Sequence, residues 1–166
     1  DVRFDDDVVY GKGGDVDLTL DLARPKDAKG ACRCILIIHG GGWAAGQKEQ
    51  HDDLTWGFAQ RGWVAASVGY RFAPKHPFPA QVEDVKCAVR FLRAHAEEYG
   101  IDPKKIWAMG FSAGAHLSMM LGVMDDDETA RVQAVVSFFG PTDLMAADIP
   151  DSSKPILKNA LGGERE

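Results

Sequence analysis

The sequence has few cysteines, no excess of positive charge and no long apolar run. The formal net charge of its 166 residues is −6, whereas binding to nucleic-acid phosphates requires clustered lysine and arginine. No segment approaches the ~20 apolar residues of a transmembrane helix. We therefore expect neither nucleic-acid binding nor a membrane span. The length instead predicts one globular domain over residues 1–166 with a sizeable core.

The three cysteines, Cys32, Cys34 and Cys87, are an odd number, which argues against a complete disulfide framework. Cys32 and Cys34 are two positions apart in an expected strand, so both should point to one face as small packed side chains. Their spacing is not that of a metal-ligand pair, and we expect no metal site. The acidic opening, residues 1–7, lacks the basic and apolar regions of a signal peptide. A cytoplasmic protein and a secreted mature form both fit, and the oligomeric state stays open.

Polar and apolar residues alternate over residues 15–22, which predicts a half-buried strand with Asp21 among its solvent-facing positions. A preceding strand over residues 3–10 and a turn at 11–14 would complete an antiparallel hairpin. Continuous apolar runs at 34–38, 63–68, 106–111 and 132–139 are typical of strands buried on both faces.

Helical patterns separate these runs, at residues 52–61, at 79–99 and from just after Ser112 to near Gly122. Asp102 and Pro103 predict a turn before the next strand. The alternation predicts an α/β protein with a mostly parallel, doubly wound sheet, helices on both faces and an antiparallel N-terminal hairpin.

The first motif with chemical meaning is Gly110-Phe111-Ser112-Ala113-Gly114, which fits G-x-S-x-G at the junction of an expected strand and helix. In that context the serine lies on a tight, strained turn that exposes its hydroxyl group as a nucleophile. Glycines at both flanks permit the close approach of strand and helix. The backbone N–H of Ala113, at the helix N-terminus, would then point at a developing oxyanion.

The second motif is His39-Gly40-Gly41-Gly42-Trp43, directly after the apolar run at 34–38. An HGGG loop in this place supplies further backbone N–H groups to an oxyanion hole. A phosphate-binding loop would need G-K-[ST], and a dinucleotide site G-x-G-x-x-G; neither pattern is present here. Because both hydrolase motifs follow strands in the expected order, we predict an oxyanion hole and no organic cofactor.

The chain resembles the HGGG-bearing esterases and lipases of the α/β-hydrolase fold, including hormone-sensitive-lipase-like and bacterial feruloyl or acetyl-xylan esterase-like families. The resemblance rests on the stretches 39–43, 70–74, 77–80, 99–103 and 110–116. It implies that the N–H groups of Gly41 and Gly42 join that of Ala113 in holding the oxyanion, and that His39 is structural. The family's usual Ala-Gly-Gly-His after the nucleophile reads Ala113-Gly114-Ala115-His116 here.

A general base for Ser112 is harder to find in the sequence. In this fold the triad acid and then the histidine follow the nucleophile, yet His116 is the one histidine after Ser112, and it lies in the same expected helix. We interpret it as structural, and Asp143 as a turn residue. Residues 1–166 therefore predict the fold without its last strands and helices, with triad Asp and His beyond residue 166 and an uncovered sheet edge after 132–139. Three explanations for the missing part of the fold remain open: it has been lost, it lies in a second chain, or the sequence as given is incomplete.

These observations predict a serine carboxylic-ester hydrolase that acts on a small-molecule ester by acyl transfer through Ser112. Trp43, Phe72 and Phe78 are candidates for pocket walls or for core positions. An arylformamidase-like amidase is one alternative, because such enzymes resemble this chain in their His-Gly-Gly-x-Trp loop. A non-catalytic module of the same fold is the other.

Overall fold

The computed structural model describes residues 1–124, 126–146 and 148–163, and its centre is a six-stranded sheet in the order β1-β2-β4-β3-β5-β6. The first two strands and the β2/β4 pair are antiparallel, whereas β3/β4, β3/β5 and β5/β6 are parallel. The predicted N-terminal hairpin and parallel sheet are thus confirmed. The strands are β1 (Val2–Gly13), β2 (Val16–Pro25), β3 (Cys32–Ile38), β4 (Val64–Val68), β5 (Ile101–Phe111) and β6 (Ala134–Phe138).

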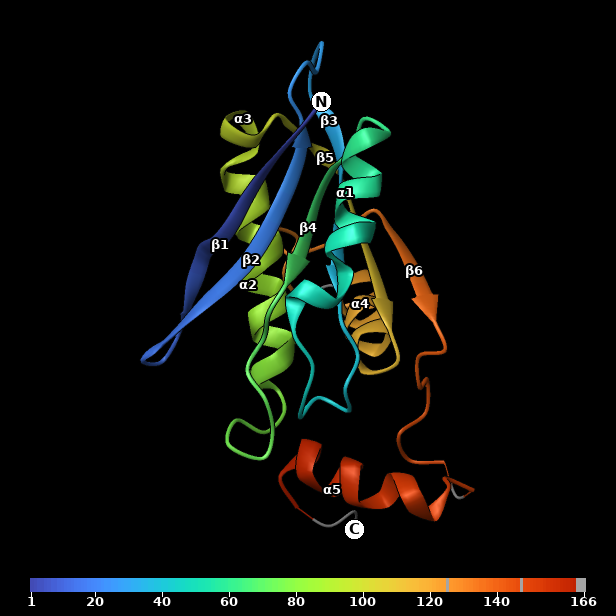
Figure 1. The fold of residues 1–166 in the computed structure, drawn as a ribbon. Coiled ribbons are helices and arrows are strands. Elements are labelled where there is room, and N and C mark those ends of the chain that lie inside the picture. The colour runs from blue at the N-terminus through green and yellow to red at the C-terminus, as the bar shows by residue number, and fades with distance from the viewer. Residues whose placement is uncertain (125, 147, 164–166) are drawn as a thin grey trace.

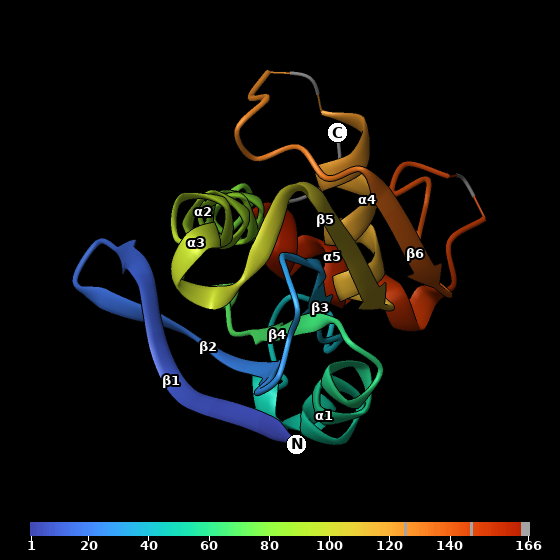
Figure 2. The ribbon, with the colours of Figure 1, turned by 90° about the horizontal axis from the view of Figure 1, so that it is seen from above.

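Helices cover both faces of this sheet, as the apolar strands predict (Figure 2). The helix α1 (Asp52–Gln60) lies on one face, and α2 (Ala80–Ala94), α3 (Ala96–Tyr99) and α4 (Ala113–Val123) lie on the other. Every residue from 34 to 38 of β3 is buried. Leu36 and Ile38 belong to the core on the α2/α4 side, and Ile35 and Ile37 to the core on the α1 side. A strand covered on both faces has no solvent side, which explains its unbroken apolar run.

A further helix, α5 (Lys154–Leu161), follows the short 3₁₀ turn η2 (Asp151–Ser153) and lies beyond the carboxyl ends of the parallel strands β3, β4, β5 and β6 (Figure 1). Leu157 and Ala160 are buried on its inner side within the main core cluster. The sequence patterns did not predict this helix. None of the helices in the described part of the chain is long and apolar enough to span a membrane.

Asp21 does not face solvent as the alternation in residues 15–22 predicts. Its side chain is fully buried, whereas Val16 on the same strand is exposed. The oxygen Oδ2 of Asp21 accepts a hydrogen bond from Nζ of Lys48 at 2.9 Å, so a buried charge is retained because it is paired. The simple period-two interpretation was wrong at Asp21 because both faces of this strand are covered.

Two expected boundaries also differ. The helical pattern over 79–99 forms two helices, because the backbone of His95 leaves helical geometry between α2 and α3. The turn expected at Asp102 and Pro103 lies inside β5 rather than before it, as a shift in pairing register against β3 between Cys32 and Cys34. The local signal was sound, since the carboxylate of Asp102 caps the N–H of Lys104, but the strand resumes its pairing beyond it.

The strand β6 lies at the edge of the sheet, paired with β5. Phe138 is 41% exposed and the adjacent Phe139 is 76% exposed. Large exposed aromatic side chains on an edge strand are unusual for an isolated surface. They agree with the uncovered edge expected from the sequence.

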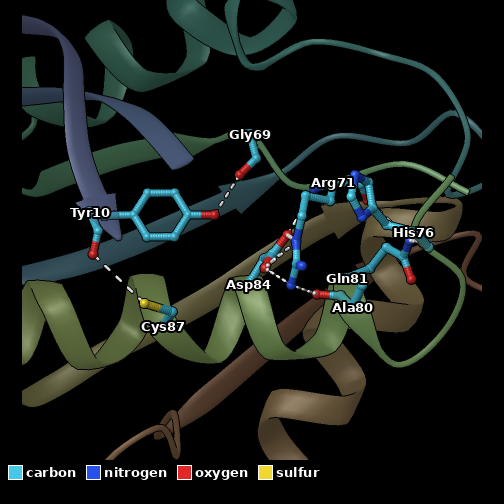
Figure 3. Close-up of polar contacts among 8 residues, drawn as sticks. All are labelled: Tyr10, Gly69, Arg71, His76, Ala80, Gln81, Asp84 and Cys87. Carbon is cyan, nitrogen blue, oxygen red and sulfur yellow. Dashed lines mark hydrogen bonds and ion pairs between the residues drawn. The ribbon is translucent and has the colours of Figure 1, made fainter. Parts of the chain in front are cut away.

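An ion pair ties the start of α2 to the segment that follows β4 (Figure 3). The guanidinium of Arg71 donates to both carboxylate oxygens of Asp84, with N–O distances from 2.7 to 3.0 Å. The backbone N–H of Arg71 donates to the same carboxylate at 2.8 Å. The side-chain amide of Gln81 donates to the carbonyls of Arg71 and His76. Residues 71–76 have no regular secondary structure, so these bonds fix their path.

Replacing Asp84 by alanine should destabilise the fold by about 3 kcal/mol, because it leaves the guanidinium of Arg71 largely buried without its anion. The neighbouring Glu83 is exposed, so Glu83→Ala should change the free energy of unfolding by less than about 0.5 kcal/mol. Urea unfolding of the two variants measures the difference. Equal stabilities would show that the Arg71–Asp84 pair contributes nothing specific.

Candidate active site

Ser112 lies between the end of β5 and the first residue of α4, where the sequence predicts the nucleophile. Its φ of 51° and ψ of −117° place a non-glycine residue in the positive-φ region, which is strained and persists only when its surroundings impose it. The N–H of Ser112 donates to the carbonyl of Phe138 at 3.0 Å, and its own carbonyl accepts from His116 at 3.1 Å. The side chain is exposed, and the turn therefore presents the hydroxyl outward.

The flanking glycines leave no room for a side chain. A Cβ on Gly110 would overlap the carbonyl of Gly114, and a Cβ on Gly114 would overlap the carbonyls of Ile38 and His39. Backbone atoms cannot withdraw as a flexible side chain can. The close contact of β3, β5 and α4 at this point is the physical reason for glycine at both ends of G-x-S-x-G.

The loop after β3 approaches the serine turn because β3 and β5 are neighbours in register. Ile38 pairs with Gly110 at the ends of the two strands, so the residues that follow each strand leave the sheet side by side. A Cβ on Gly40 would lie 2.9 Å from the carbonyl oxygen of Phe111 and 3.3 Å from Cβ of Ser112. The two sequence motifs, about 70 positions apart, thus meet at one place.

The expected oxyanion-hole residues have free donors. Gly41 and Gly42 adopt φ angles of 118° and 60°, and the carbonyl of Gly41 accepts from Ala44 and Ala45. In residues 1–124, 126–146 and 148–163, the N–H groups of Gly41, Gly42 and Ala113 donate to no backbone carbonyl. Ala113 is the first residue of α4, where an N–H has no partner within the helix.

A cavity of about 360 Å³ opens at the serine. Ser112, Ala113 and Gly42 line one side of it, and Phe139, Leu144 and Ile156 are among the residues that line the rest. Gly41 is not on its wall, although it belongs to the same loop. The structure thus brings two of the three expected donors and the serine to one apolar cavity.

The side chain of His39 packs against the segments around the loop that follows β3. Its ring is fully buried and stacked on Tyr70, with 4.4 Å between ring centroids. Its Nδ1 lies 2.7 Å from the carbonyl oxygen of Gly40, a distance at which a protonated Nδ1 donates a hydrogen bond. The hydroxyl of Tyr70 donates to the carbonyl of His39 at 2.9 Å. Burial lowers the pKa of His39, so the ring is neutral at pH 7 and holds the start of the glycine loop.

The other histidines lack the setting of a general base. His116 lies edge-on against Trp43, with 5.4 Å between centroids, and its buried Nδ1 has no hydrogen-bond partner among the described residues. Burial lowers the pKa of His116. His51 stacks on Phe111, and burial lowers its pKa too. His95 is exposed, and its Nδ1 lies near the carbonyl of Phe91. No carboxylate in the described residues is bonded to a histidine ring, as the orientation of a triad base would require.

The remaining candidate residues from the sequence fall into two groups, those that line the cavity and those that do not. Asp143 lines the cavity, and its Oδ1 accepts from the N–H of Met145 at 2.8 Å, which is the behaviour expected of a turn residue. Trp43 also lines the cavity while packing in the core. Phe72 instead packs against the ring of His39. Phe78 is 43% exposed and is absent from the cavity wall.

A buried cation anchors the far end of the glycine loop, and sequence reasoning missed it. Lys48, in the 3₁₀ turn η1 (Lys48–His51), contacts the carboxylates of Asp21 at 2.9 Å, Asp7 at 3.0 Å and Glu49 at 2.6 Å. Burial opposes its charge, but these bonds outweigh it and raise the pKa of Lys48. Burial raises the pKa of Asp21 to about 6, against the hydrogen bond from Lys48. The hydroxyl of Ser67 also donates to the carbonyl of Lys48 at 2.6 Å.

The fold and this serine turn define an α/β-hydrolase of the esterase and lipase class. The sequence model of the BD-FAE family matches residues 20–165, and the chain therefore belongs to that family. It is 33% identical to the probable carboxylic ester hydrolase LipM of Mycobacterium tuberculosis, over 95% of this chain and 38% of LipM. It is 30% identical to mouse arylacetamide deacetylase, over 78% of this chain and 35% of that protein.

Solved esterase structures share the fold. Thermogutta terrifontis esterase 2 phosphonylated by sarin superposes with a TM-score of 0.82 at 31% identity, over 95% of this chain and 63% of that one. A truncated carbohydrate esterase from gut microbiota superposes with a TM-score of 0.74 at 31% identity, over 85% of this chain and 57% of that one. The chain thus spans about two fifths of LipM and three fifths of the solved esterases.

Replacing Lys48 by methionine should cost about 3 kcal/mol or more, because the buried carboxylate of Asp21 loses its cation. The double variant Lys48→Met/Asp21→Leu should recover most of this loss, since neither charge then remains. Lys12→Met is the matched control, because the Lys12 side chain is 71% exposed and surface pairs contribute little. Thermal unfolding that ranks Lys48→Met beside Lys12→Met would contradict the anchoring role.

Proposed function

We propose that this chain supplies the nucleophile and the oxyanion hole of a serine carboxylic-ester hydrolase. One observation carries the proposal: a strained, exposed Ser112 shares a cavity wall with the unpaired N–H groups of Gly42 and Ala113. An exposed nucleophile beside preorganised donors is the arrangement that acyl transfer needs. The family membership and the esterase relatives support it.

In the proposed reaction, Oγ of Ser112 attacks the ester carbonyl while its proton passes to a base. The carbonyl oxygen becomes an oxyanion, which accepts hydrogen bonds from the N–H groups of Gly41, Gly42 and Ala113. Each such donor contributes about 3 kcal/mol to transition-state stabilisation in well-studied serine hydrolases. Collapse of the intermediate expels the alcohol, which takes the proton, and water then releases the acid by the same steps.

We also propose that the general base is a residue outside residues 1–166. The packing of His39 and His116 supports this, because each ring is partly or fully buried with a lowered pKa and neither is oriented by a carboxylate. Free serine hydroxyl groups are poor nucleophiles without a base. The isolated chain should then keep only the contribution of binding and the oxyanion hole, a rate about 10³ to 10⁴ over water.

The decisive experiment compares the purified chain with Ser112→Ala and with Ser152→Ala, an exposed serine off the cavity wall, as the control. We expect slow addition of one phosphonyl group from a fluorophosphonate probe, lost in Ser112→Ala and kept in Ser152→Ala. Slow hydrolysis of p-nitrophenyl acetate, which depends on binding and the oxyanion hole, should remain in all three proteins. Labelling that survives in Ser112→Ala would refute the assignment of the nucleophile.

The same assays separate the alternatives. Turnover of the 166-residue chain near ordinary enzyme rates, about 10 s⁻¹, would contradict a base outside it. Faster cleavage of p-nitroacetanilide than of the matched ester would favour an amidase. Labelling of Ser112 no faster than that of the exposed Ser152, even after prolonged incubation of a folded chain, would favour a non-catalytic module.

A further inference from the structure

The helix α5 closes one side of the cavity at Ser112 and is fixed there at several points. On its inner face, Leu157 and Ala160 are buried in the main core. The carbonyl of Ala160 accepts a hydrogen bond from the N–H of Phe78 at 2.8 Å. Gly162, just after the helix, lies close to Pro77. The helix therefore rests on the segment around residues 77–78 as well as on the core.

One side chain of α5 stands directly over the oxyanion loop. A Cβ placed on Gly42 would lie 2.8 Å from Cγ2 of Ile156, so Ile156 fills the space beside that glycine. Ile156 is 43% exposed and lines the cavity together with Leu157. Any substrate whose carbonyl oxygen binds the N–H of Gly42 must therefore place one of its two remaining groups near Ile156.

The chemistry of the two half-reactions indicates which group this is. The alcohol leaves after the first half-reaction and needs an open path to solvent. The acyl group stays bonded to Ser112, and its carbonyl must remain in the oxyanion hole until water attacks. The apolar part of the cavity that α5 closes therefore suits the acyl group.

From this arrangement, and on the basis of the proposed function, we infer that Ile156 limits the length of the acyl group that the site accepts. Leu144, Ile149 and Leu157 line the same cavity, and Asp143 and Ser153 are on its wall as well. Because Ile156 fills the space beside Gly42, the preferred substrates are esters of short acids, from acetyl to butyryl.

The test measures binding, so that it does not depend on turnover. In a Ser112→Ala background, p-nitrophenyl acetate, butyrate and octanoate are titrated while quenching of tryptophan fluorescence is followed, since Trp43 lines the cavity. Adding Ile156→Ala should tighten binding of the octanoate relative to the acetate by about tenfold. Leu161→Ala, on the same helix but off the cavity wall, should leave that ratio within about twofold.

A larger side chain at Ile156 tests whether a change in binding comes from the size of that side chain or from a loss of stability. Ile156→Phe should weaken binding of the butyrate and octanoate while leaving the acetate within about twofold. An unchanged ratio in both Ile156 variants would overturn the inference, as would a response to ethyl, butyl and octyl acetates, which differ in the alcohol alone. Either result leaves the role of Ser112 untouched, because that role is decided by labelling and turnover.

Discussion

The close contact of three backbone segments at the end of β3 and β5 is the constraint on which the site depends. Gly114 at the start of α4 packs so tightly against the carbonyls of Ile38 and His39 that no Cβ fits between them. This contact presses α4 toward the sheet and leaves Ser112 in a strained conformation, at a cost of order 1–3 kcal/mol. The strain persists because two buried, hydrogen-bonded strands and a helix all oppose its relaxation.

Buried polar groups hold the irregular segments around this contact. The ring of His39 and the hydroxyl of Tyr70 fix the start of the glycine loop. The ammonium of Lys48 fixes its end, and the pair Arg71–Asp84 fixes the segment beside it. Loops cannot satisfy their backbone groups internally as helices and strands do. Here paired charges take that role, and each carries a large penalty if one partner is removed.

The serine turn and the glycine loop were predictable from sequence because their chemistry depends on local backbone geometry. G-x-S-x-G and HGGG encode positive φ angles and close approaches, and each follows an apolar run long enough to be recognised as a strand. The position of Ser112 beside Gly40 and Gly42 then needs only that the two strands be neighbours. This is a short inference from the α/β alternation.

The buried charges and α5 were not predictable because they depend on contacts between residues far apart in the sequence. Asp21 looks like an ordinary polar position of an alternating strand. Its burial is possible because a lysine 27 positions later donates a hydrogen bond to its carboxylate. Nothing local distinguishes Lys48 from a surface lysine. The helix α5 has eight residues, too few for a clear periodic pattern, and its place over Gly42 is set by tertiary packing.

The geometry also explains why the proposed nucleophile and its base need not lie close together in the sequence. Ser112 and the proposed oxyanion donors come from the segments that follow β3 and β5, which pair at Ile38 and Gly110. Their mutual geometry therefore depends on two adjacent strands and one helix, all within residues 32–123. A base oriented by a carboxylate has no such local requirement, since it must only reach Oγ of Ser112 from wherever the fold supplies it. The proposed oxyanion hole thus depends on strand register, whereas the proton acceptor depends only on reach.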